Sequence, residues 1–145
     1  MTARAAAGYS GKPLAQKLGI KEGMTVVAVD APPHYRRLLG PLPAGARIAS
    51  RQPARRTPLE FIHCFASARR TLTTRFRAIE RRLAPAGALW VSWPKGGSQV
   101  ATDLNENVVR EVGLAHGLVD VKVCAVDDTW SGLKFVRRVR DRTER

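Results

Sequence analysis

Near-continuous apolar runs, separated by segments with helical periodicity, are the feature that most constrains how this chain can fold. The sequence reads TVVAVD at residues 25–30, LEFIHCFA at residues 59–66 and ALWVSW at residues 88–93. Runs of this composition and length are typical of strands buried on both faces of a parallel sheet. Because parallel neighbours are joined by crossover connections, usually helices, the alternation predicts an α/β fold.

Two short helices are expected on either side of the first run. One spans residues 13–19, and the other begins at Pro32 or Pro33 and ends at Gly40. Proline suits the first turn of a helix, where its missing N–H would have no partner in any case. Glycine suits the left-handed residue that follows the last turn, so both segments have a start and a stop signal.

Two longer amphipathic helices are expected later in the chain. The first carries apolar residues at spacings of four, three and four, which places them on one stripe: Leu72, Phe76, Ile79 and Leu83. Pro85 and Gly87 are expected to end this helix, whose other face is rich in arginine. The second is expected to begin at a capping box of Asp103 and Glu106 and to stop at Gly117.

Further strands complete the predicted sheet. A short one is expected at residues 46–50, and two longer ones at residues 118–126 and 132–139 are separated by a loop that is long enough for a hairpin. The architecture that follows is a three-layer, Rossmann-like, mostly parallel sheet with helices on both faces and a C-terminal antiparallel hairpin strand.

The length of the chain favours one domain. We expect residues 1–145 to form it, with residues 1–8 and 140–145 frayed. No apolar run approaches the roughly 18 residues that suggest a membrane-spanning helix, and the first ten residues make a poor signal peptide. We therefore expect a cytoplasmic protein that has no membrane partner.

The charge balance is strongly basic. Lysine and arginine total 25 against 12 acidic residues, a formal net charge of +13, and the arginines include five doublets. The doublets are Arg36–Arg37, Arg55–Arg56, Arg69–Arg70, Arg81–Arg82 and Arg137–Arg138. Such a surface attracts polyanions, so nonspecific nucleic acid is an expected partner, with an affinity that falls as salt rises. The alternative is that these arginines are only the solvated faces of packed helices.

The cysteines and histidines give no metal-binding pattern. Cys64 and Cys124 lie in apolar runs, where a thiol usually behaves as a small buried hydrophobic group. His63 and Cys64 are adjacent in a predicted strand, so their side chains point to opposite faces and cannot share an ion. We expect no metal site, and we regard His34, near the start of a helix, as the one histidine to test for proton transfer.

Several motifs resemble known families. The stretches GYSGKPLAQKLGIKEG, ALWVSWPKG, TDLNENVVREV and GLVDVKVCAVDDTWSGLKF resemble an uncharacterised bacterial family of unknown function. The order of elements, with LGIKEGMTVVAVDAP early and RRLAPAGALWVSWP in the middle, resembles the class I S-adenosylmethionine-dependent methyltransferase core. This second resemblance implies that the last strand is antiparallel and inserted beside its predecessor.

The methyltransferase resemblance also implies a cofactor site, and this chain departs from it. A working member has a glycine-rich turn after the first strand and an acidic residue after the second. Here the first turn reads Asp30, Ala31, Pro32, Pro33, and the second strand is followed by Arg51. Too few residues separate the second strand from residue 59 to hold the helix, strand and helix that many members insert there. A shortened methyltransferase-like topology with a rebuilt or lost cofactor site is predicted.

Polar and aromatic residues are expected to gather beyond the carboxyl ends of the strands, where ligands bind in sheets of this class. The candidate ligand-binding residues are Asp30, Pro32, His34, Trp93, Lys95, Ser98, Asp127, Asp128 and Trp130. Carboxylates, a lysine and indole rings could hold a polar, partly aromatic small molecule. Equally, the aspartates could cap turns and the tryptophans could seal the edge of the core.

Three functions remain open from the sequence. We expect a non-catalytic ligand-binding or regulatory module with a degenerate methyltransferase-like site. The alternatives are a methyltransferase that binds S-adenosylmethionine in an atypical site, and a basic nucleic-acid-associated protein. The methyltransferase-like strand order also places Cys64 and Cys124 on strands separated by two others, about 14 Å apart, which is too far for a disulfide.

Overall fold

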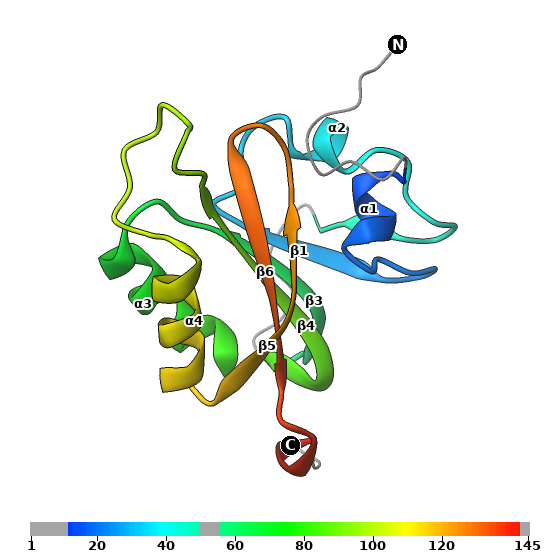
Figure 1. Ribbon diagram of the computed structural model, residues 1–145. Helices are drawn as coiled ribbons and strands as arrows, with labels where there is room; N and C mark the ends of the chain where they lie inside the picture. The colour runs from blue at the N-terminus through cyan, green and yellow to red at the C-terminus, as the bar shows by residue number, and fades with distance from the viewer. Residues whose placement is uncertain (1–11, 50–55, 143–145) are drawn as a thin grey trace.

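The computed structural model describes residues 12–49 and 56–142 and contains a six-stranded sheet with the order β2-β1-β3-β4-β6-β5 (Figure 1). The strands are β1 (Thr25–Val29), β2 (Arg47–Ile48), β3 (Leu59–Phe65), β4 (Leu83–Pro94), β5 (Leu118–Ala125) and β6 (Trp130–Arg137). The strands β1 to β4 are parallel to one another, and β6 runs antiparallel to both β4 and β5. The predicted mostly parallel sheet with a closing antiparallel strand is therefore confirmed.

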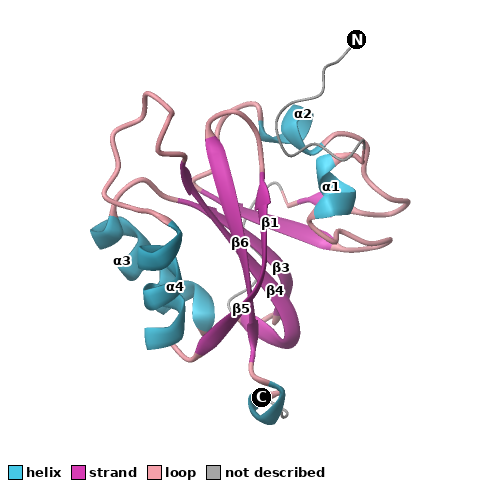
Figure 2. Ribbon diagram, viewed as in Figure 1, coloured by secondary structure: helices cyan, strands magenta, loops and turns pink. Residues whose placement is uncertain are grey.

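Helices cover the two faces of this sheet (Figures 1 and 2). The short helices α1 (Leu14–Lys17) and α2 (Tyr35–Leu39) lie on one side, and α3 (Arg69–Glu80) and α4 (Glu106–Ala115) lie on the other. Each layer packs on its own apolar cluster, in which the sheet residues alternate between the two sides. The predicted three layers are present, and a single turn of 3-10 helix, Val139–Asp141, follows β6.

The amphipathic stripe of α3 explains its place against the sheet. Leu72, Phe76 and Ile79 are buried, while most of the arginines of the helix are exposed. The fourth residue of the predicted stripe, Leu83, is not helical, because the helix ends at Glu80 and β4 begins at Leu83. Leu83 is 1% exposed and pairs with Leu59, so pairing with β3 overrides the helical period.

Pro85 and Gly87, which are expected to end α3, lie inside β4 instead. Residues 83–88 bulge where they pair with the start of β3, and this irregular stretch accommodates the proline and glycine at positions 85 and 87. At Gly87 an added Cβ would lie 2.8 Å from the carbonyl oxygen of Leu59, which explains why the close approach needs glycine.

The capping box of Asp103 and Glu106 predicted for α4 is wrong, because Glu106 is the first residue of the helix and its carboxylate pairs with Arg110. The N-cap is Asn105, whose Oδ1 accepts a hydrogen bond of 2.9 Å from the backbone N–H of Val108. Asp103 instead accepts the backbone N–H of Arg69 at 2.7 Å, so it caps the neighbouring helix α3. The hydrogen bond from Arg69 to Asp103 joins the loop before α4 to the start of α3. The end of α4 is as expected, with Gly117 in the left-handed region at φ 85°.

Strand direction brings several chain segments to one edge of the sheet. β1, β3, β4 and β5 all run the same way, so their carboxyl ends meet the start of β6 there. Two backbone hydrogen bonds join these ends: Ala66 N–H to Ser92 O at 3.0 Å, and Lys95 N–H to Thr129 O at 2.8 Å. The expected meeting of the loops that follow β1, β4 and β5 is therefore confirmed.

Some expectations fall at the margins of the described residues. Of the segments expected to be frayed, residues 1–8 and the last three of residues 140–145 lie outside them. Arg51, which stands where the methyltransferase resemblance implies an acidic residue, also lies outside them. The second predicted strand is present but shorter, with only Arg47 and Ile48 in β2. None of the helices in residues 12–49 and 56–142 is long and apolar enough to cross a membrane.

Candidate functional site

A cavity of about 350 Å³ lies at the carboxyl edge between β1, β3, α3 and the start of β6. Its lining residues are Asp30, Phe65, Ala66, Ser67, Thr71, Arg75 and Trp130. We call this cavity the edge cleft. It combines two opposite charges, two hydroxyl groups and two aromatic rings in one space.

An ion pair spans the edge cleft. The Arg75 guanidinium donates from Nε to one Asp30 carboxylate oxygen at 2.7 Å and from Nη2 to the other at 3.4 Å. The hydrogen bond to Asp30 is the main cause that raises the pKa of Arg75, and the negative charge of the carboxylate adds to it. Both side chains are between two fifths and one half exposed, so water and solutes can reach the pair.

The backbone of Asp30 is unusual. Its φ is 58°, in the left-handed region, and it is the one residue other than glycine in the described parts of the chain with a positive φ. That conformation costs a residue with a Cβ roughly 1–2 kcal/mol, although aspartate tolerates it better than most. The turn after β1 therefore keeps a backbone conformation that glycine usually supplies, but it also presents a carboxylate.

Aromatic rings form one wall of the edge cleft. The rings of Trp130 and Phe65 meet edge to face, with centroids 5.1 Å apart. Phe65 in turn stacks on His63, with centroids 4.3 Å apart. Ser67 and Thr71 stand at the start of α3, and Thr71 lies one helical turn before Arg75 on the same helix face.

A buried polar network lies behind this wall. Tyr35 Oη is 2.8 Å from His63 Nδ1, and His63 Nε2 is 2.8 Å from Ser92 Oγ. Burial lowers the pKa of His63 to about 3, so the imidazole is neutral and has one donor and one acceptor nitrogen for these two hydroxyls. Burial also raises the pKa of Tyr35. Since Tyr35 is the first residue of α2, the network fixes the segment that follows Asp30.

This network is sealed from solvent. His63 and Ser92 are fully buried, and Tyr35 is 5% exposed. A serine next to a histidine can act as a nucleophile only where a substrate reaches it. We therefore assign these residues a structural role, as expected for a satisfied core histidine.

The structure moves one predicted site residue into the core. Trp93 is 5% exposed and belongs to the apolar cluster beneath α3 and α4, so it does not line the edge cleft. Trp93 and Ser92 alternate along β4, so Trp93 points toward the layer of α3 and α4, where it packs in the core. Trp130, on the neighbouring strand, is the indole that lines the cleft.

Two other predicted residues lie side by side next to the edge cleft. His34 is at the N-cap position of α2, and its Nε2 is 3.8 Å from Asp127 Oδ2. The other oxygen of Asp127 accepts the backbone N–H groups of Thr129 and Trp130 at 2.8 and 2.7 Å. Asp127 thus shapes the β5–β6 turn, as the alternative interpretation of the aspartates predicts.

The remaining predicted residues are placed in loops. Pro32 accepts the backbone N–H of Tyr35 at 3.0 Å and forms the turn before α2. Lys95 is half-buried, and its carbonyl accepts the N–H of Ser98 at 3.0 Å. Asp128 is exposed in the turn between β5 and β6. None of these four residues, Pro32, Lys95, Ser98 and Asp128, lines the edge cleft.

Sequence reasoning missed Arg75 and Thr71. Both lie in a stretch that is fully explained as the solvated face of a helix, so composition offers no signal. Topology offers one, because a helix that follows a parallel strand starts at the ligand-binding edge. Polar residues on its first two turns are therefore candidates, and Thr71 and Arg75 are spaced four apart there.

A second cavity of about 350 Å³ adjoins the first between β1 and α3. Its walls combine apolar side chains, among them Val27, Val29, Ile62 and Ile79, with the charged side chains of Asp30, Arg75 and Arg82. Asp30 and Arg75 line both cavities, so the ion pair stands between them. In residues 12–49 and 56–142, no three His, Cys, Asp or Glu side chains are grouped as metal ligands.

Solved methyltransferases share this fold. A SAM-dependent methyltransferase from Aquifex aeolicus gives a TM-score of 0.58 over 83% of this chain and 85% of its own, at 14% identity. The N-methyltransferase NodS from Bradyrhizobium japonicum gives 0.50 over 84% and 88%, at 13% identity. Magnesium protoporphyrin IX methyltransferase from Synechocystis PCC 6803, with bound SAH, gives 0.50 over 86% and 78%, at 9% identity.

These similarities show the fold alone. No family model matches the sequence, and no curated protein matches it. The chain has a class I methyltransferase-like core in a shortened form of 145 residues.

Proposed function

We infer that this protein is a non-catalytic ligand-binding or regulatory module built on a methyltransferase-like core. The observation that carries the inference is the turn after β1, where Asp30 binds Arg75 across the edge cleft. Its ligand is a small molecule that combines a charged group with an aromatic or apolar part. The charged group would replace one partner of the ion pair, and the ring would pack on Trp130 or against the apolar side chains of the adjoining cavity.

The same turn fits S-adenosylmethionine poorly. A cofactor that approaches the backbone closely needs N–H donors and the absence of side chains. Pro32 and Pro33 have no N–H, and Asp30 adds a carboxylate that Arg75 already holds. These features support a rebuilt site, and we derive no reaction step through that cofactor.

The chemistry of the edge cleft also favours binding over catalysis. The titratable side chains that line it are Asp30 and Arg75, and each already binds the other. A guanidinium stays protonated, so it cannot act as a general base. The nearby Ser92 and His63 are sealed in the core.

One observation favours methyl transfer as a second candidate. The left-handed backbone at Asp30 is the conformation that a glycine turn would have, so an atypical cofactor site could use it. This candidate requires that the protein transfers labelled methyl groups from S-adenosylmethionine to a component of a cell extract. It also requires that Asp30→Ala abolishes the transfer.

A set of three probes with the same ring tests the binding function. 3-Phenylpropanoate, phenethylamine and L-phenylalanine share a phenyl ring on a two-carbon chain and differ only in the charged groups that this chain carries. Each is added at millimolar concentration to the full chain in a thermal unfolding assay. At ten times its Kd, a ligand stabilises by about 1.4 kcal/mol, which raises the Tm by about 4 °C. We expect at least one probe to do so.

Variants identify the site. Arg75→Gln should abolish the stabilisation by a carboxylate probe, and Asp30→Asn the stabilisation by an amine probe. Arg77→Gln, an exposed change on the same helix that does not touch the cleft, is the control and should leave both unchanged. The function is refuted if no probe raises the Tm, or if the rise is the same in all the variants.

A further inference from the structure

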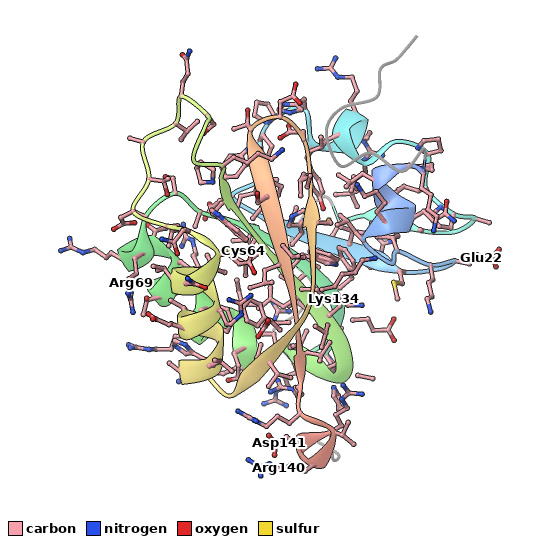
Figure 3. The ribbon with its side chains drawn as sticks, viewed as in Figure 1. Glu22, Cys64, Arg69, Lys134, Arg140 and Asp141 are labelled. Carbon is pink, nitrogen blue, oxygen red and sulfur yellow. The ribbon has the colours of Figure 1, made fainter. Side chains whose placement is uncertain are left out.

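The two helical layers of the molecule differ in how their charges are compensated. On the side of α3 and α4, arginines pair with carboxylates: Arg69 with Glu111, Arg110 with Glu106 and Asp120, and Arg137 with Glu80. Figure 3 labels Arg69 on this side of the sheet. The positive charge of this layer is therefore partly neutralised within the protein, while Arg70 and Arg77 of α3 are exposed and have no ion pair among the described residues.

Lysines gather on the opposite side. Four of the six lysines in the chain, Lys17, Lys21, Lys122 and Lys134, lie where the β5–β6 hairpin meets the end of α1. Lys122 and Lys134 are directly opposed across the two strands. Lys122 Nζ donates to the carbonyl of Lys17 at 3.1 Å, which ties the hairpin to α1. We call these four residues the lysine face.

Like charges directly opposed across two strands destabilise a sheet, so their presence calls for a compensating partner. No carboxylate in the described parts of the chain lies within ion-pair distance of Lys21, Lys122 or Lys134. Burial lowers the pKa of Lys134, and the positive charges of Lys122 and Lys21 lower it further. Glu22 follows Lys21 in sequence, but its side chain lies far from Lys134 in Figure 3.

The surroundings of this face select among anionic partners. Arg36 and Arg37 are exposed on α2, which lies in the same layer as α1, and extend the positive surface. Two exposed apolar side chains, Val121 and Val123, flank Lys122 on β5, and none comes from α1 or α2. Val123 pairs with Leu133, which belongs to the cluster beneath α3 and α4, so strand alternation points it away from the lysine face. A membrane-binding surface would combine its cations with such apolar side chains. A row of ammonium groups on which exposed apolar side chains do not form a continuous surface suits phosphate groups, which lysine binds as a point charge.

We propose that the lysine face binds the phosphodiester backbone of nucleic acid without reading its sequence. Trp90, which pairs with Lys134 across β4 and β6, is buried, so it offers bases no ring to stack on there. Affinity comes from phosphate neutralisation and release of counterions, and it depends steeply on salt. This surface is separate from the edge cleft, so either function can fail without the other.

Fluorescence anisotropy with a labelled 20-base-pair duplex of random sequence, at several KCl concentrations, tests the proposal. The full chain should bind, and log Kd should rise linearly with log[KCl]. In the double variant Lys122→Gln/Lys134→Gln, the slope should fall by about 2, because each lost phosphate contact removes about 0.9. The variant should fold, since the substitution removes a like-charge pair.

The matched control removes two charges from the other layer. Arg70→Gln/Arg77→Gln changes exposed residues of α3 and should leave the slope unchanged, with an affinity within about twofold of the original. Three results would overturn the proposal: equal losses in both double variants, binding to phosphatidylserine vesicles but not to the duplex, or displacement of the duplex by an equal charge concentration of poly-L-glutamate.

Discussion

His63 shows how a single buried residue can shape the site without touching a ligand. It joins α2 to β3 and β4 through the hydroxyls of Tyr35 and Ser92, and so holds the segment after Asp30. The sequence indicates that this histidine is structural, because it lies in an apolar strand. It does not identify the two hydroxyl partners, which come from positions 28 and 29 residues away.

The burial of His63 makes the stability of the protein depend on pH. In the unfolded chain a histidine has a pKa near 6.5, whereas the pKa of folded His63 is about 3. Between these values His63 binds a proton in the unfolded chain but not in the folded protein. Its contribution to the free energy of unfolding is therefore fully present above pH 6.5 and decreases as the pH falls. From pH 7.5 to 5.5, His63 should reduce the free energy of unfolding by about 1.4 kcal/mol.

Urea denaturation at both pH values measures this effect. His63→Gln should be less stable at both, since Tyr35 and Ser92 lose part of their hydrogen bonding, but its pH dependence should be smaller by about 1.4 kcal/mol. An unchanged pH dependence in the variant would mean that His63 is not buried and neutral.

The left-handed backbone of Asp30 gives a second prediction at this scale. Asp30→Gly and Asp30→Ala both remove the ion pair with Arg75, but only glycine relieves the backbone. Asp30→Gly should therefore be more stable than Asp30→Ala by about 1 kcal/mol in urea denaturation. Equal stabilities would show that the turn does not hold this conformation in solution.

At the scale of elements, the sequence predicts most helices and strands, because apolar periodicity reflects burial. It fails where an element depends on a neighbour. Leu83 continues the helical stripe of α3 and yet pairs with β3, and Asp103 caps a helix that begins 34 positions earlier in the sequence. For the same reason, the sequence predicts only some of the residues that line the edge cleft. Asp30 and Trp130 follow from strand ends, whereas Arg75 depends on how α3 is oriented.

The packing of α4 on β6 is tight enough to test. At Gly113 an added Cβ would overlap the ring of Phe135. Gly113→Ala should therefore destabilise the protein by about 1–3 kcal/mol, although alanine favours a helix over glycine by about 1 kcal/mol. Gly97→Ala, a loop position where an added Cβ meets no atom within 4 Å, should change stability by less than about 1 kcal/mol. If Gly113→Ala were the more stable protein in urea denaturation, this packing would be wrong.

At the scale of the whole molecule, strand order decides which residues can meet. Cys64 on β3 and Cys124 on β5 are separated by β4 and β6, as the sequence predicted. Burial is the main cause that raises the pKa of the Cys64 thiol, to about 12, and Cys124 is only half-buried.

Alkylation followed by mass spectrometry tests this arrangement. In the native protein Cys124 should react with iodoacetamide faster than Cys64, and both should react after denaturation. No Cys64–Cys124 disulfide should form in the folded monomer. A native bridge, or faster labelling of Cys64, would contradict the strand order.

The central claim is that the turn after β1 does not bind S-adenosylmethionine and that its Asp30 instead pairs with Arg75 at the edge cleft. Isothermal titration calorimetry of the full chain with S-adenosylmethionine tests it most directly. The account predicts a Kd weaker than about 1 mM, which corresponds to a binding free energy of less than about 4 kcal/mol. Saturable binding with micromolar affinity would contradict it.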